Sequence, residues 1–394
     1  LGGRSGFCGN MLMRATSRAQ LATRWQQWRA DFDVAALVFG AVLRFDGRSL
    51  WFGIAACAIA ATVATFQFAV FTSFLAAGAA GPRFIGADAW IVERGIECFD
   101  FPTPIAEGYR GALLGELPGA RIDRIVIGYA GWLSPTGGRG NVALIGVDDA
   151  GLSPREFRAD RSDLSRLDLK QGQTGASIGG VSVELAGVTR ALATFLGAPY
   201  AVMDYEAAHG ILGYPVDNAA MLAVHFPDGV PHDLEDRLRR IEARCPELGA
   251  VTGAQFEASS SAYWQNKTGA GAAILLAAAL ASLLMGLLLV NSVGRFVQRR
   301  QSDIISMLGH GASPSQIRAV LLAMAGFLVA AALGAALLMV PLMIRIAHPL
   351  LPWVHFSFAD LVFVIVVSAL CLIASVIAAS RELGRFPADA IFRS

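Results

Sequence analysis

The sequence predicts an α-helical integral membrane protein with four transmembrane helices and an α+β extracytoplasmic domain inserted between helices 1 and 2. Hydrophobic residues make up 55% of the 394 residues and charged residues only 16%, whereas an ordinary soluble domain carries about 25% charged residues. Four windows contain no Asp, Glu, Lys or Arg: 49–82, 268–294, 319–344 and 361–380. Each is long enough, as a helix, to cross a hydrocarbon core of about 30 Å. About 190 residues separate the first two windows, which is ample for a hydrophobic core.

These windows divide the chain into nine segments. We expect a cytoplasmic N-terminal segment with an amphipathic helix (1–48), transmembrane helix 1 (49–77), the extracytoplasmic domain (78–267), transmembrane helix 2 (268–294), a cytoplasmic loop (295–318), transmembrane helix 3 (319–344), a short external loop (345–360), transmembrane helix 4 (361–380) and a cytoplasmic tail (381–394). The first residue is Leu1, and Met11 is a candidate start of translation. The first apolar run begins too far along the chain for a cleaved signal peptide.

The charges beside the windows predict the orientation. Residues 1–77 hold seven Arg against three Asp, whereas residues 78–267 hold 17 basic and 24 acidic groups. The loop 295–318 has four Arg against one Asp, and the tail has three Arg against two acids. Basic residues collect on the cytoplasmic side of membrane proteins. We therefore expect both termini and the loop 295–318 in the cytoplasm and the large domain outside.

The large domain has patterns of both strands and helices. One amphipathic segment, Asp233–Cys245, places Leu234, Leu238, Ile241 and Cys245 on one face of a helix. It lies between a strand and a candidate strand at Ala250–Thr252, which predicts a strand–helix–strand unit. The strand-like runs are Arg124–Tyr129, Val142–Val147, Val181–Leu185 and Met221–Phe226.

Two of the five cysteines, Cys98 and Cys245, fall in the domain expected outside the membrane. Disulfides persist in such an environment, so a Cys98–Cys245 bridge is one hypothesis. Two separate buried thiols are the alternative, because sequence does not establish the Cα separation that a bridge needs.

Several kinds of chemistry have no support in the sequence. Neither Lys170 nor Lys267 belongs to a phosphate-binding loop of the form G-x-x-x-x-G-K-[ST]. The six histidines form neither H-E-x-x-H nor a zinc set. Gly175-Ala-Ser177-Ile-Gly179 has the letters of a nucleophile elbow, but a strand-like run follows it where a helix is required. We therefore expect no catalytic residue, no metal and no cofactor, and the charge pattern indicates no nucleic-acid partner.

The loop between the second and third windows is the most informative stretch, Arg299-Arg-Gln-Ser-Asp-Ile-Ile-Ser-Met-Leu-Gly-His-Gly-Ala-Ser-Pro-Ser-Gln-Ile-Arg318. Residues Asp303–Leu308 are expected to form a short helix that ends at Gly309 and Gly311. Ser313 is a predicted N-cap with Gln316 three residues later, which is a capping box that opens the third span. Such a hairpin is either a well-capped connector or a seat for a cytoplasmic partner.

This loop resembles that of the permeases of the MacB, FtsX and LolC type, which are the membrane subunits of type VII ABC transporters. The shared pattern is Arg-Arg-x-x-Asp-Ile-x-x-Met-Leu-Gly-x-Gly-Ala-Ser-x-x-Gln-Ile. The ending Phe386-Pro-Ala-Asp-Ala-Ile-Phe-Arg393 and the order of one span, large domain and three spans are also similar. The resemblance covers residues 34–394.

The DevC-like branch of that family is the most similar one. Two departures from it concern the loop: Asp303 stands where the family usually has Glu, and Leu308 where DevC-like members often have Lys. The residues that carry the resemblance are Pro118-Gly119, Gly128-x-Ala-x-Trp132, Gly137, Ile145-Gly146-Val-Asp148, Phe256, Tyr263-Trp264 and Thr268-Gly269.

The resemblance implies a division of labour between subunits. A separate cytoplasmic ABC ATPase would bind ATP and grip the loop, and the chain would sit in the bacterial inner membrane, usually with a second permease copy as a homodimer. Its motion would pass through the first two spans to the outer domains. DevC-like permeases also imply an HlyD-type membrane fusion protein and an outer-membrane channel that exports amphiphiles. The residues implied in ATPase coupling are Asp303, Ile304, Met307, Leu308, Gly309, Gly311, Ser313 and Gln316.

The leading hypothesis from the sequence is thus the permease subunit of a tripartite ABC exporter. An FtsX-like subunit that regulates an outer-side enzyme has the same architecture and is the first alternative. A membrane-anchored receptor without an ATPase is the second. A membrane enzyme ranks third, because the sequence offers no convincing catalytic constellation.

Overall fold

The computed structural model describes residue 40 and residues 47–170 and 175–383. The chain divides into two compact units. The helical unit takes the chain up to Phe66, Ala277–Pro341 and the residues from Phe358 onwards, and the sheet unit takes Gln67–Leu276 and Leu342–Ser357. The amphipathic helix expected within 1–48, Cys8 and the closing sequence 386–393 lie outside the described residues.

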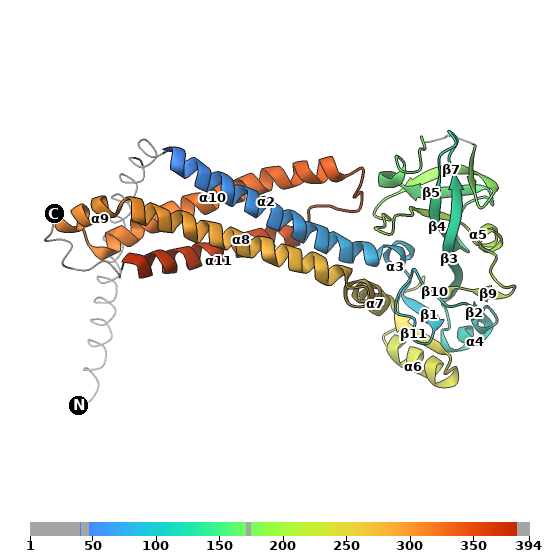
Figure 1. Cartoon of the computed structure of the whole chain (residues 1–394). Coiled ribbons are helices and arrows are strands. Elements are labelled where there is room, and N and C mark those ends of the chain that lie inside the picture. The colour runs from blue at the N-terminus through green and yellow to red at the C-terminus, as the bar shows by residue number, and fades with distance from the viewer. Residues whose placement is uncertain (1–39, 41–46, 171–174, 384–394) are drawn as a thin grey trace, which may run out of the picture. The chain divides into compact units, whose positions relative to one another are not determined.

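Four long helices are the main elements of the helical unit (Figure 1). They are α2 (Gly47–Gly78), α8 (Ala270–Arg299), α10 (Pro314–Ala347) and α11 (Phe358–Leu383). Among the described residues, these four are the helices long and apolar enough to cross a membrane. By the length and composition of its helices, the chain is therefore a multi-pass membrane protein.

The helices extend beyond the apolar windows of the sequence. Helix α8 runs to Arg299 and α10 begins at Pro314, so the loop expected at 295–318 holds the ends of both helices and a short helix between them, α9 (Gln301–Gly309). The external loop, expected at 345–360, is reduced to residues 348–357. Hydrophobicity marks where a helix meets lipid, whereas the backbone hydrogen bonds that define the helix continue into water.

One hydrophobic cluster contains residues of α2, α8, α9, α10 and α11. Small side chains bring α2 into this cluster, since Cys57, Ala60 and Ala61 are all buried. Such residues let helix backbones approach closely in lipid. The other helices contribute larger side chains such as Leu289, Leu328 and Val364 together with further alanines.

The sheet unit contains every described strand, and all of them lie in the chain between α2 and α8. The strands are β1 (Ala89–Glu93), β2 (Ile105–Ala106), β3 (Arg121–Leu133), β4 (Arg139–Val147), β5 (Glu156–Asp160), β6 (Ala176–Ile178), β7 (Val181–Thr189), β8 (Tyr200–Asp204), β9 (Asn218–Ala219), β10 (Met221–His225) and β11 (Leu248–Thr252). The helices are α3 (Ala80–Ile85), α4 (Tyr109–Glu116), the 3-10 turn η1 (Arg161–Asp163), α5 (Tyr205–Leu212), α6 (Leu234–Arg244) and α7 (Gly253–Asn266). All four predicted strand runs and the amphipathic helix are confirmed.

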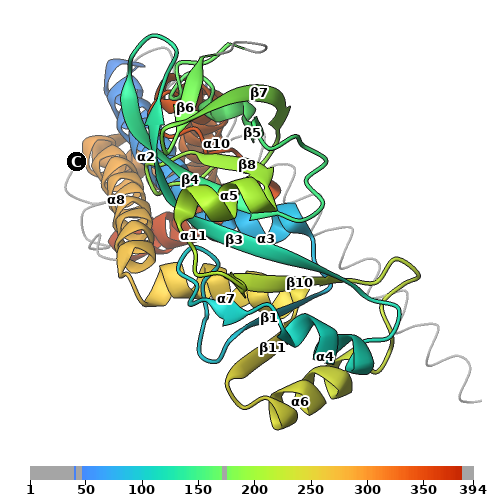
Figure 2. The same ribbon diagram turned by 90° about the vertical axis from the view of Figure 1, so that its right-hand side faces the viewer.

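The long strand β3 joins two parts of one nine-stranded sheet (Figure 2). The strand order is β11-β1-β10-β3-β4-β8-β5-β7-β6, and β6 also pairs with the end of β3 through Trp132 and Ile178. The strands from β3 to β6 therefore close into a ring of six, while β10, β1 and β11 continue the sheet on the other side of β3. Closure removes the open edge that β6 would otherwise present.

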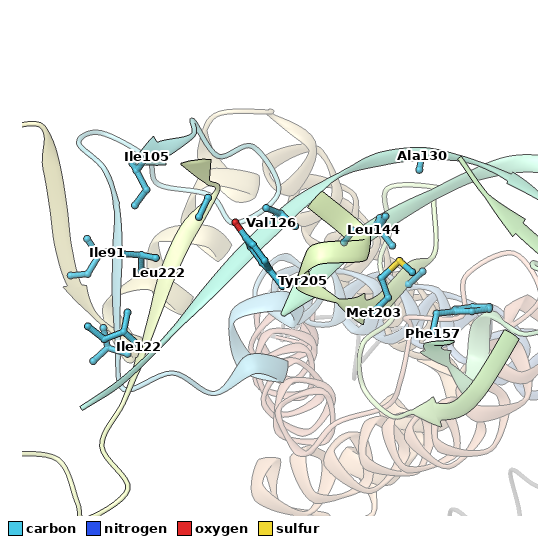
Figure 3. Close-up of a cluster of buried hydrophobic side chains, with 14 of the residues drawn as sticks. Ile91, Ile105, Ile122, Val126, Ala130, Leu144, Phe157, Met203, Tyr205 and Leu222 are labelled. Atoms are coloured by element: carbon cyan, nitrogen blue, oxygen red, sulfur yellow. The ribbon is translucent and has the colours of Figure 1, made fainter. Parts of the chain in front are cut away.

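The central strands of the sheet are buried on both faces, and their alternate residues belong to different cores. In β3, Ile125 and Ile127 belong to one hydrophobic cluster and Val126 to the other. Tyr200 and Met203 of β8 divide between the clusters in the same way. Strands buried on both faces have nearly continuous apolar sequences, as Val142–Val147 and Met221–Phe226 do, whereas Val181–Leu185 in β7 alternates apolar and polar residues and has one exposed face. Figure 3 shows the larger cluster, with Phe157 and Leu144 among its labelled side chains.

The predicted strand–helix–strand unit is confirmed as β10–α6–β11. Strands β10 and β11 both pair antiparallel with β1, so they run parallel to each other with β1 between them. Helix α6 buries Leu234, Leu238 and Ile241. The Gly175–Gly179 stretch is a strand and turn: Ser177 lies in β6, and Gly179 and Gly180 have positive φ before β7 begins. No helix follows Ser177, so the stretch is not a nucleophile elbow.

Candidate functional site

The hairpin between α8 and α10 carries the residues that the sequence singles out for coupling. Helix α9 has one buried face and one exposed face. Ile304 is buried in the cluster of the helical unit, and Leu308 packs against the same cluster. Asp303 lies on the opposite side with its side chain 57% exposed, and it accepts a 2.9 Å hydrogen bond from Arg300. The exposed face consists of Gln301, Ser302, Asp303, Ser306 and His310.

The end of α9 is closed by backbone hydrogen bonds around Gly311. The Ala312 amide donates to the Met307 carbonyl at 2.9 Å, and the Gly311 amide donates to the Leu308 carbonyl at 3.0 Å. This pair of bonds is the Schellman motif. It requires a left-handed residue, and Gly311 has a φ of 89°. A side chain at that position would be strained, which explains why glycine stands there.

The start of α10 is closed by the capping box that the sequence predicts. The Gln316 amide donates to Ser313 Oγ at 3.3 Å, and Gln316 Oε1 accepts from the Ser313 amide at 3.0 Å. Two backbone amides at the start of α10, those of Ser313 and Gln316, are thereby paired. Since the two motifs follow each other directly, the turn between α9 and α10 has little conformational freedom.

The predicted coupling residues therefore have different roles. Asp303 and Gly309 are exposed and Met307 is half-buried, so they can meet a partner. Ile304 and Leu308 hold α9 against the helical unit. Gly311, Ser313 and Gln316 shape the turn. The exposed Ser306 and His310 belong to the same face as Asp303, and the helical period of α9 was the signal that would have added them.

Sequence reasoning missed a buried polar group in the sheet unit, centred on Asp100. The Asp100 side chain accepts hydrogen bonds from three donors: the Tyr200 hydroxyl, Trp264 Nε1 at 3.2 Å and Cys98 Sγ at 3.7 Å. Burial raises the pKa of Asp100 above its usual range despite these bonds. Burial, with Asp100 nearby, also raises the pKa of Cys98 to about 12. The thiol is thus a protonated donor at neutral pH.

Aromatic rings extend this group into a junction cluster, which we define as Phe74, Cys98, Asp100, Phe195, Tyr200, Trp264 and Trp353. Phe195 is central to it, with ring centroids 4.5 Å from Phe74 and 4.7 Å from Trp264. Trp353 lies 6.2 Å from Phe195. The cluster joins the last turns of α2, the end of α7 just before α8, and the loop between α10 and α11. Three segments that lead into long apolar helices are therefore held together inside the sheet unit.

The hypothesised Cys98–Cys245 disulfide is not formed, because both cysteines are free. Cys98 packs with Phe74 and Trp264 in the junction cluster. Cys245 follows α6 and packs against the larger core of the sheet. The structure thus has two separate thiols, as the alternative expected, but only Cys98 is fully buried and Cys245 is half-buried.

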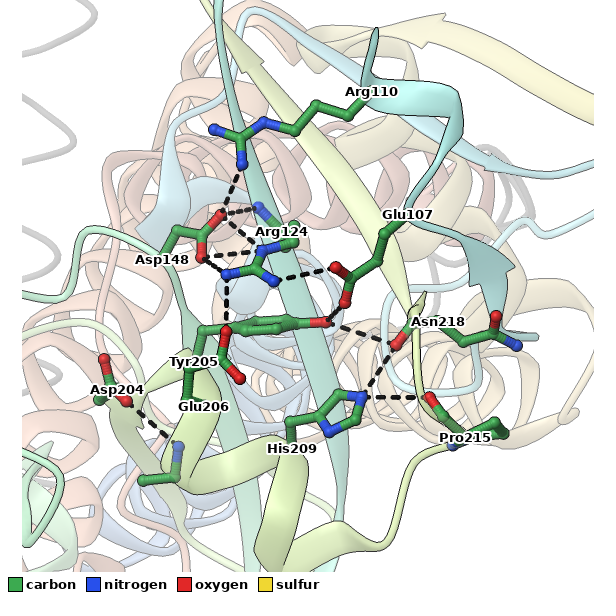
Figure 4. A network of polar contacts seen from close by, with 11 residues as sticks. Glu107, Arg110, Arg124, Asp148, Asp204, Tyr205, Glu206, His209, Pro215 and Asn218 are labelled. Carbon is green, nitrogen blue, oxygen red and sulfur yellow. Dashed lines mark hydrogen bonds and ion pairs between the residues drawn. The ribbon is translucent and has the colours of Figure 1, made fainter.

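A second polar network surrounds Arg124 on β3 (Figure 4). The guanidinium donates to Asp148 at 2.7 Å, to Glu107 at 2.9 Å and to Glu206 at 2.9 Å. It also lies 4.1 Å from the centroid of the Tyr205 ring. Burial opposes the shift, but hydrogen bonds from Tyr205 and Arg124 leave the pKa of Glu107 below its usual range. This network fastens α5 and the β2 segment to the sheet and leaves Arg124 fully compensated by acids.

Comparison with known proteins gives only distant likenesses. No family model and no curated protein matches the sequence. The periplasmic region of MacB from Actinobacillus actinomycetemcomitans is similar at 9% identity and a TM-score of 0.34, over 44% of this chain and 93% of that one. The extracellular domain of the noncanonic ABC-type transporter YknZ from Gram-positive bacteria is similar at 10% identity and a TM-score of 0.30, over 42% of this chain and 99% of that one. Likenesses of this size assign neither family nor function.

Proposed function

We propose that this chain is the permease subunit of an ATP-driven ABC exporter, in which a separate cytoplasmic ATPase grips the α9–α10 hairpin. The observation that carries the proposal is the construction of that hairpin. Its inner face is anchored by Ile304 and Leu308, its turn is closed by two capping motifs, and its outer face is exposed. A rigid hairpin with one face exposed can pass a movement of the bound ATPase on to α8 and α10, whereas a flexible loop would deform instead.

The junction cluster supports the other half of the mechanism. It gathers the ends of segments leading to α2, α8, α10 and α11 and binds them to the sheet through Tyr200 and Trp264. A shift of these helices along their axes would therefore move side chains buried in the sheet unit. On this proposal, ATP hydrolysis drives mechanical motion of the outer domain, and the chain itself hydrolyses nothing.

The complete assembly that we propose contains more than one subunit. It comprises the ATPase, a second copy of the chain, an HlyD-type membrane fusion protein and an outer-membrane channel, with a lipid-like or other amphiphilic cargo. The chain would lie in the bacterial inner membrane with the hairpin in the cytoplasm. The charge pattern of the flanking segments supports this orientation.

Charge reversal at Asp303 tests the coupling. We expect Asp303→Arg to reduce the ATP hydrolysis of the complex roughly tenfold. The substitution breaks the ion pair with Arg300 and reverses the charge on the exposed face of α9. The measurement is ATP hydrolysis by the complex reconstituted in nanodiscs. Glu235→Arg, an equal reversal on the exposed face of α6, is the control and should leave hydrolysis unchanged. Equal activity of both variants would contradict the grip on the hairpin.

A further inference from the structure

A cavity of about 650 Å³ lies in the sheet unit, and the proposed function does not account for it. Its walls come from the last turns of α2 and from α3, from η1, from the segment after β7 and from the loop between α10 and α11. This volume is within the range of sites for small organic ligands, about 300–1,000 Å³. Part of its surface is apolar, formed by Ala76, Ala77, Ala80, Ala193 and Pro352.

The charged groups around the cavity are mostly basic. Three arginines line it from three different segments: Arg83, Arg161 and Arg190. Arg83 is paired with Glu257 at 3.2 Å. Arg161 and Arg190 have no acidic partner among the described residues, in contrast to Arg124 with its three carboxylates. Two histidines, His348 and His355, also line the cavity.

The lining contains one carboxylate, Asp160, and both of its oxygens accept hydrogen bonds from nearby residues. Asp160 is 4% exposed, and its Oδ1 accepts hydrogen bonds from the Ser162 amide at 2.9 Å and the Ser162 hydroxyl at 2.7 Å. Its Oδ2 accepts from the Leu192 amide at 2.9 Å. These donors are uncharged and do not cancel the charge of a carboxylate, so the lining sets two arginines that have no ion-pair partner in the described part of the chain, Arg161 and Arg190, against one acid. The cavity therefore retains unpaired positive charge next to an apolar wall.

Hydrogen bonds within the protein hold two parts of the lining in place. The Asp160–Leu192 bond fastens the turn at Ala191, whose φ of 63° is unusual for a residue with a side chain. Backbone held in such a conformation is found at ligand clamps. Elsewhere in the lining, Ser73 Oγ donates to the His355 carbonyl at 3.1 Å and accepts from the His355 amide at 3.0 Å. Both parts of the lining are thus preorganised.

The position of the cavity along the chain indicates what kind of molecule would enter it. Ser73, Ala76 and Ala77 lie in the last turns of the candidate membrane span Trp51–Gly78. His348 directly follows α10, the span that ends at Ala347. The cavity therefore adjoins the ends of two candidate spans, and its lining combines apolar and basic side chains. An amphiphile, which joins an apolar chain to a polar head, matches that combination.

We propose that this cavity binds an amphiphile with an anionic head group, such as a phosphate or a carboxylate. Arg161 and Arg190 would hold the head group through charge-assisted hydrogen bonds, for which the planar guanidinium is well suited. The alanines, Pro352 and Trp353 would contact the chain that follows it. The site would exist whether or not an ATPase drives the protein, so its test is independent of the coupling test at Asp303.

Binding of dodecyl phosphate to the full-length chain in phosphatidylcholine nanodiscs tests the proposal. The double variant Arg161→Ala/Arg190→Ala should weaken binding roughly tenfold or more, and Arg161→Lys/Arg190→Lys should restore part of it. The matched control Arg139→Ala/Arg155→Ala removes two exposed arginines of the same unit that do not line the cavity. This control should bind dodecyl phosphate as tightly as the wild type does. Partition of the probe into the lipid of the nanodisc is the same for all variants and therefore does not affect the comparison. An unchanged unfolding temperature shows that each variant folds.

Two further probes separate the parts of the inference. Dodecyltrimethylammonium should not compete, and inorganic phosphate should bind much more weakly than dodecyl phosphate because it cannot use the apolar wall. Nanodiscs that contain phosphatidylglycerol identify the source: loss of probe binding points to a bilayer lipid, and unchanged binding points to a soluble amphiphile, both within the proposed class.

Three outcomes would overturn the proposal. The first is equal weakening in the control variant, and the second is phosphate binding as tight as that of dodecyl phosphate. The third is a partner protein retained through Arg161 and Arg190 while dodecyl phosphate does not bind.

Discussion

At the scale of single residues, buried acids of the sheet unit differ in how fully they are paired. Asp100 has three donors, whereas Asp163 has Arg166 at 2.8 Å on Oδ1 and no hydrogen-bond partner for Oδ2 among the described residues. Asp163 is 0% exposed, and burial, only partly offset by Arg166, raises its pKa to about 6. Between about pH 4 and pH 6, the carboxyl of Asp163 is therefore mostly protonated in the fold, whereas an unfolded Asp is ionised.

This shift has a definite sign in the dependence of stability on pH. The folded pKa lies above the unfolded one, so the stabilisation from the protonated form is present in full below about pH 4 and is lost as the pH rises through about 6. We expect the unfolding temperature of the wild type, relative to Asp163→Asn, to fall by about 2–4 °C between pH 5 and pH 7.5, which corresponds to about 1 kcal/mol. Thermal unfolding of the full chain measures it.

The control for that experiment is Asp228→Asn, because Asp228 is an exposed acid of the same unit. Its unfolding temperature relative to the wild type should not change over the same pH range. If Asp163→Asn likewise showed a constant difference, ionisation of Asp163 would not be linked to folding.

At the scale of elements, the turn between α9 and α10 depends on a few local hydrogen bonds. Gly311 supplies the left-handed residue and Ser313 supplies the cap. Both signals act over six residues or fewer, so a sequence contains all the information needed to recognise them. The packing of α9 was not predictable in the same way, because Ile304 and Leu308 meet side chains from helices distant in sequence.

Removing either signal should loosen the turn. Gly311→Ala is expected to cost about 1–2 kcal/mol through the left-handed conformation, and Ser313→Ala about 1 kcal/mol through the lost cap. Hydrogen exchange of the amides in residues 307–316 should therefore rise about fivefold or more in either variant. Ser302→Ala, on the exposed face of α9, is the matched control. Exchange as slow as in the wild type would show that the caps do not hold the hairpin.

At the scale of the whole molecule, the arrangement of charges around the spans predicts which parts face which side of the membrane. The hairpin segment 295–318 is basic, and the domain 78–267 carries more acids than bases. A grip by a cytoplasmic ATPase requires the hairpin to be inside, and the anionic-amphiphile site requires no particular side. Topology therefore bears on the proposed function alone.

Single cysteines report that topology directly. With the native cysteines replaced, Ser153→Cys in the sheet unit should react with a membrane-impermeant maleimide in cells with a permeabilised outer membrane. Ser306→Cys on α9 should react only after the inner membrane is also opened, although both positions are exposed. Labelling of Ser306→Cys from outside would exclude a cytoplasmic motor at the hairpin.

The sequence by itself determined the features that rest on local periodicity and local hydrogen bonding. These are the four apolar helices, the four strand runs, the amphipathic α6 and the capping box at Ser313. Each follows from residues close together in the chain, since amphipathic faces and caps repeat within one or two turns.

Only the tertiary structure decided which distant segments meet. The Asp100 bonds to Tyr200 and Trp264 span 100 and 164 residues, and the closure of β6 on β3, the separation of Cys98 from Cys245 and the arginine-lined cavity are equally non-local. No sequence pattern marks such contacts, because they arise when the apolar faces of the whole domain are buried together. The physical reason is that burial selects a partner by shape and volume, not by its position in the chain.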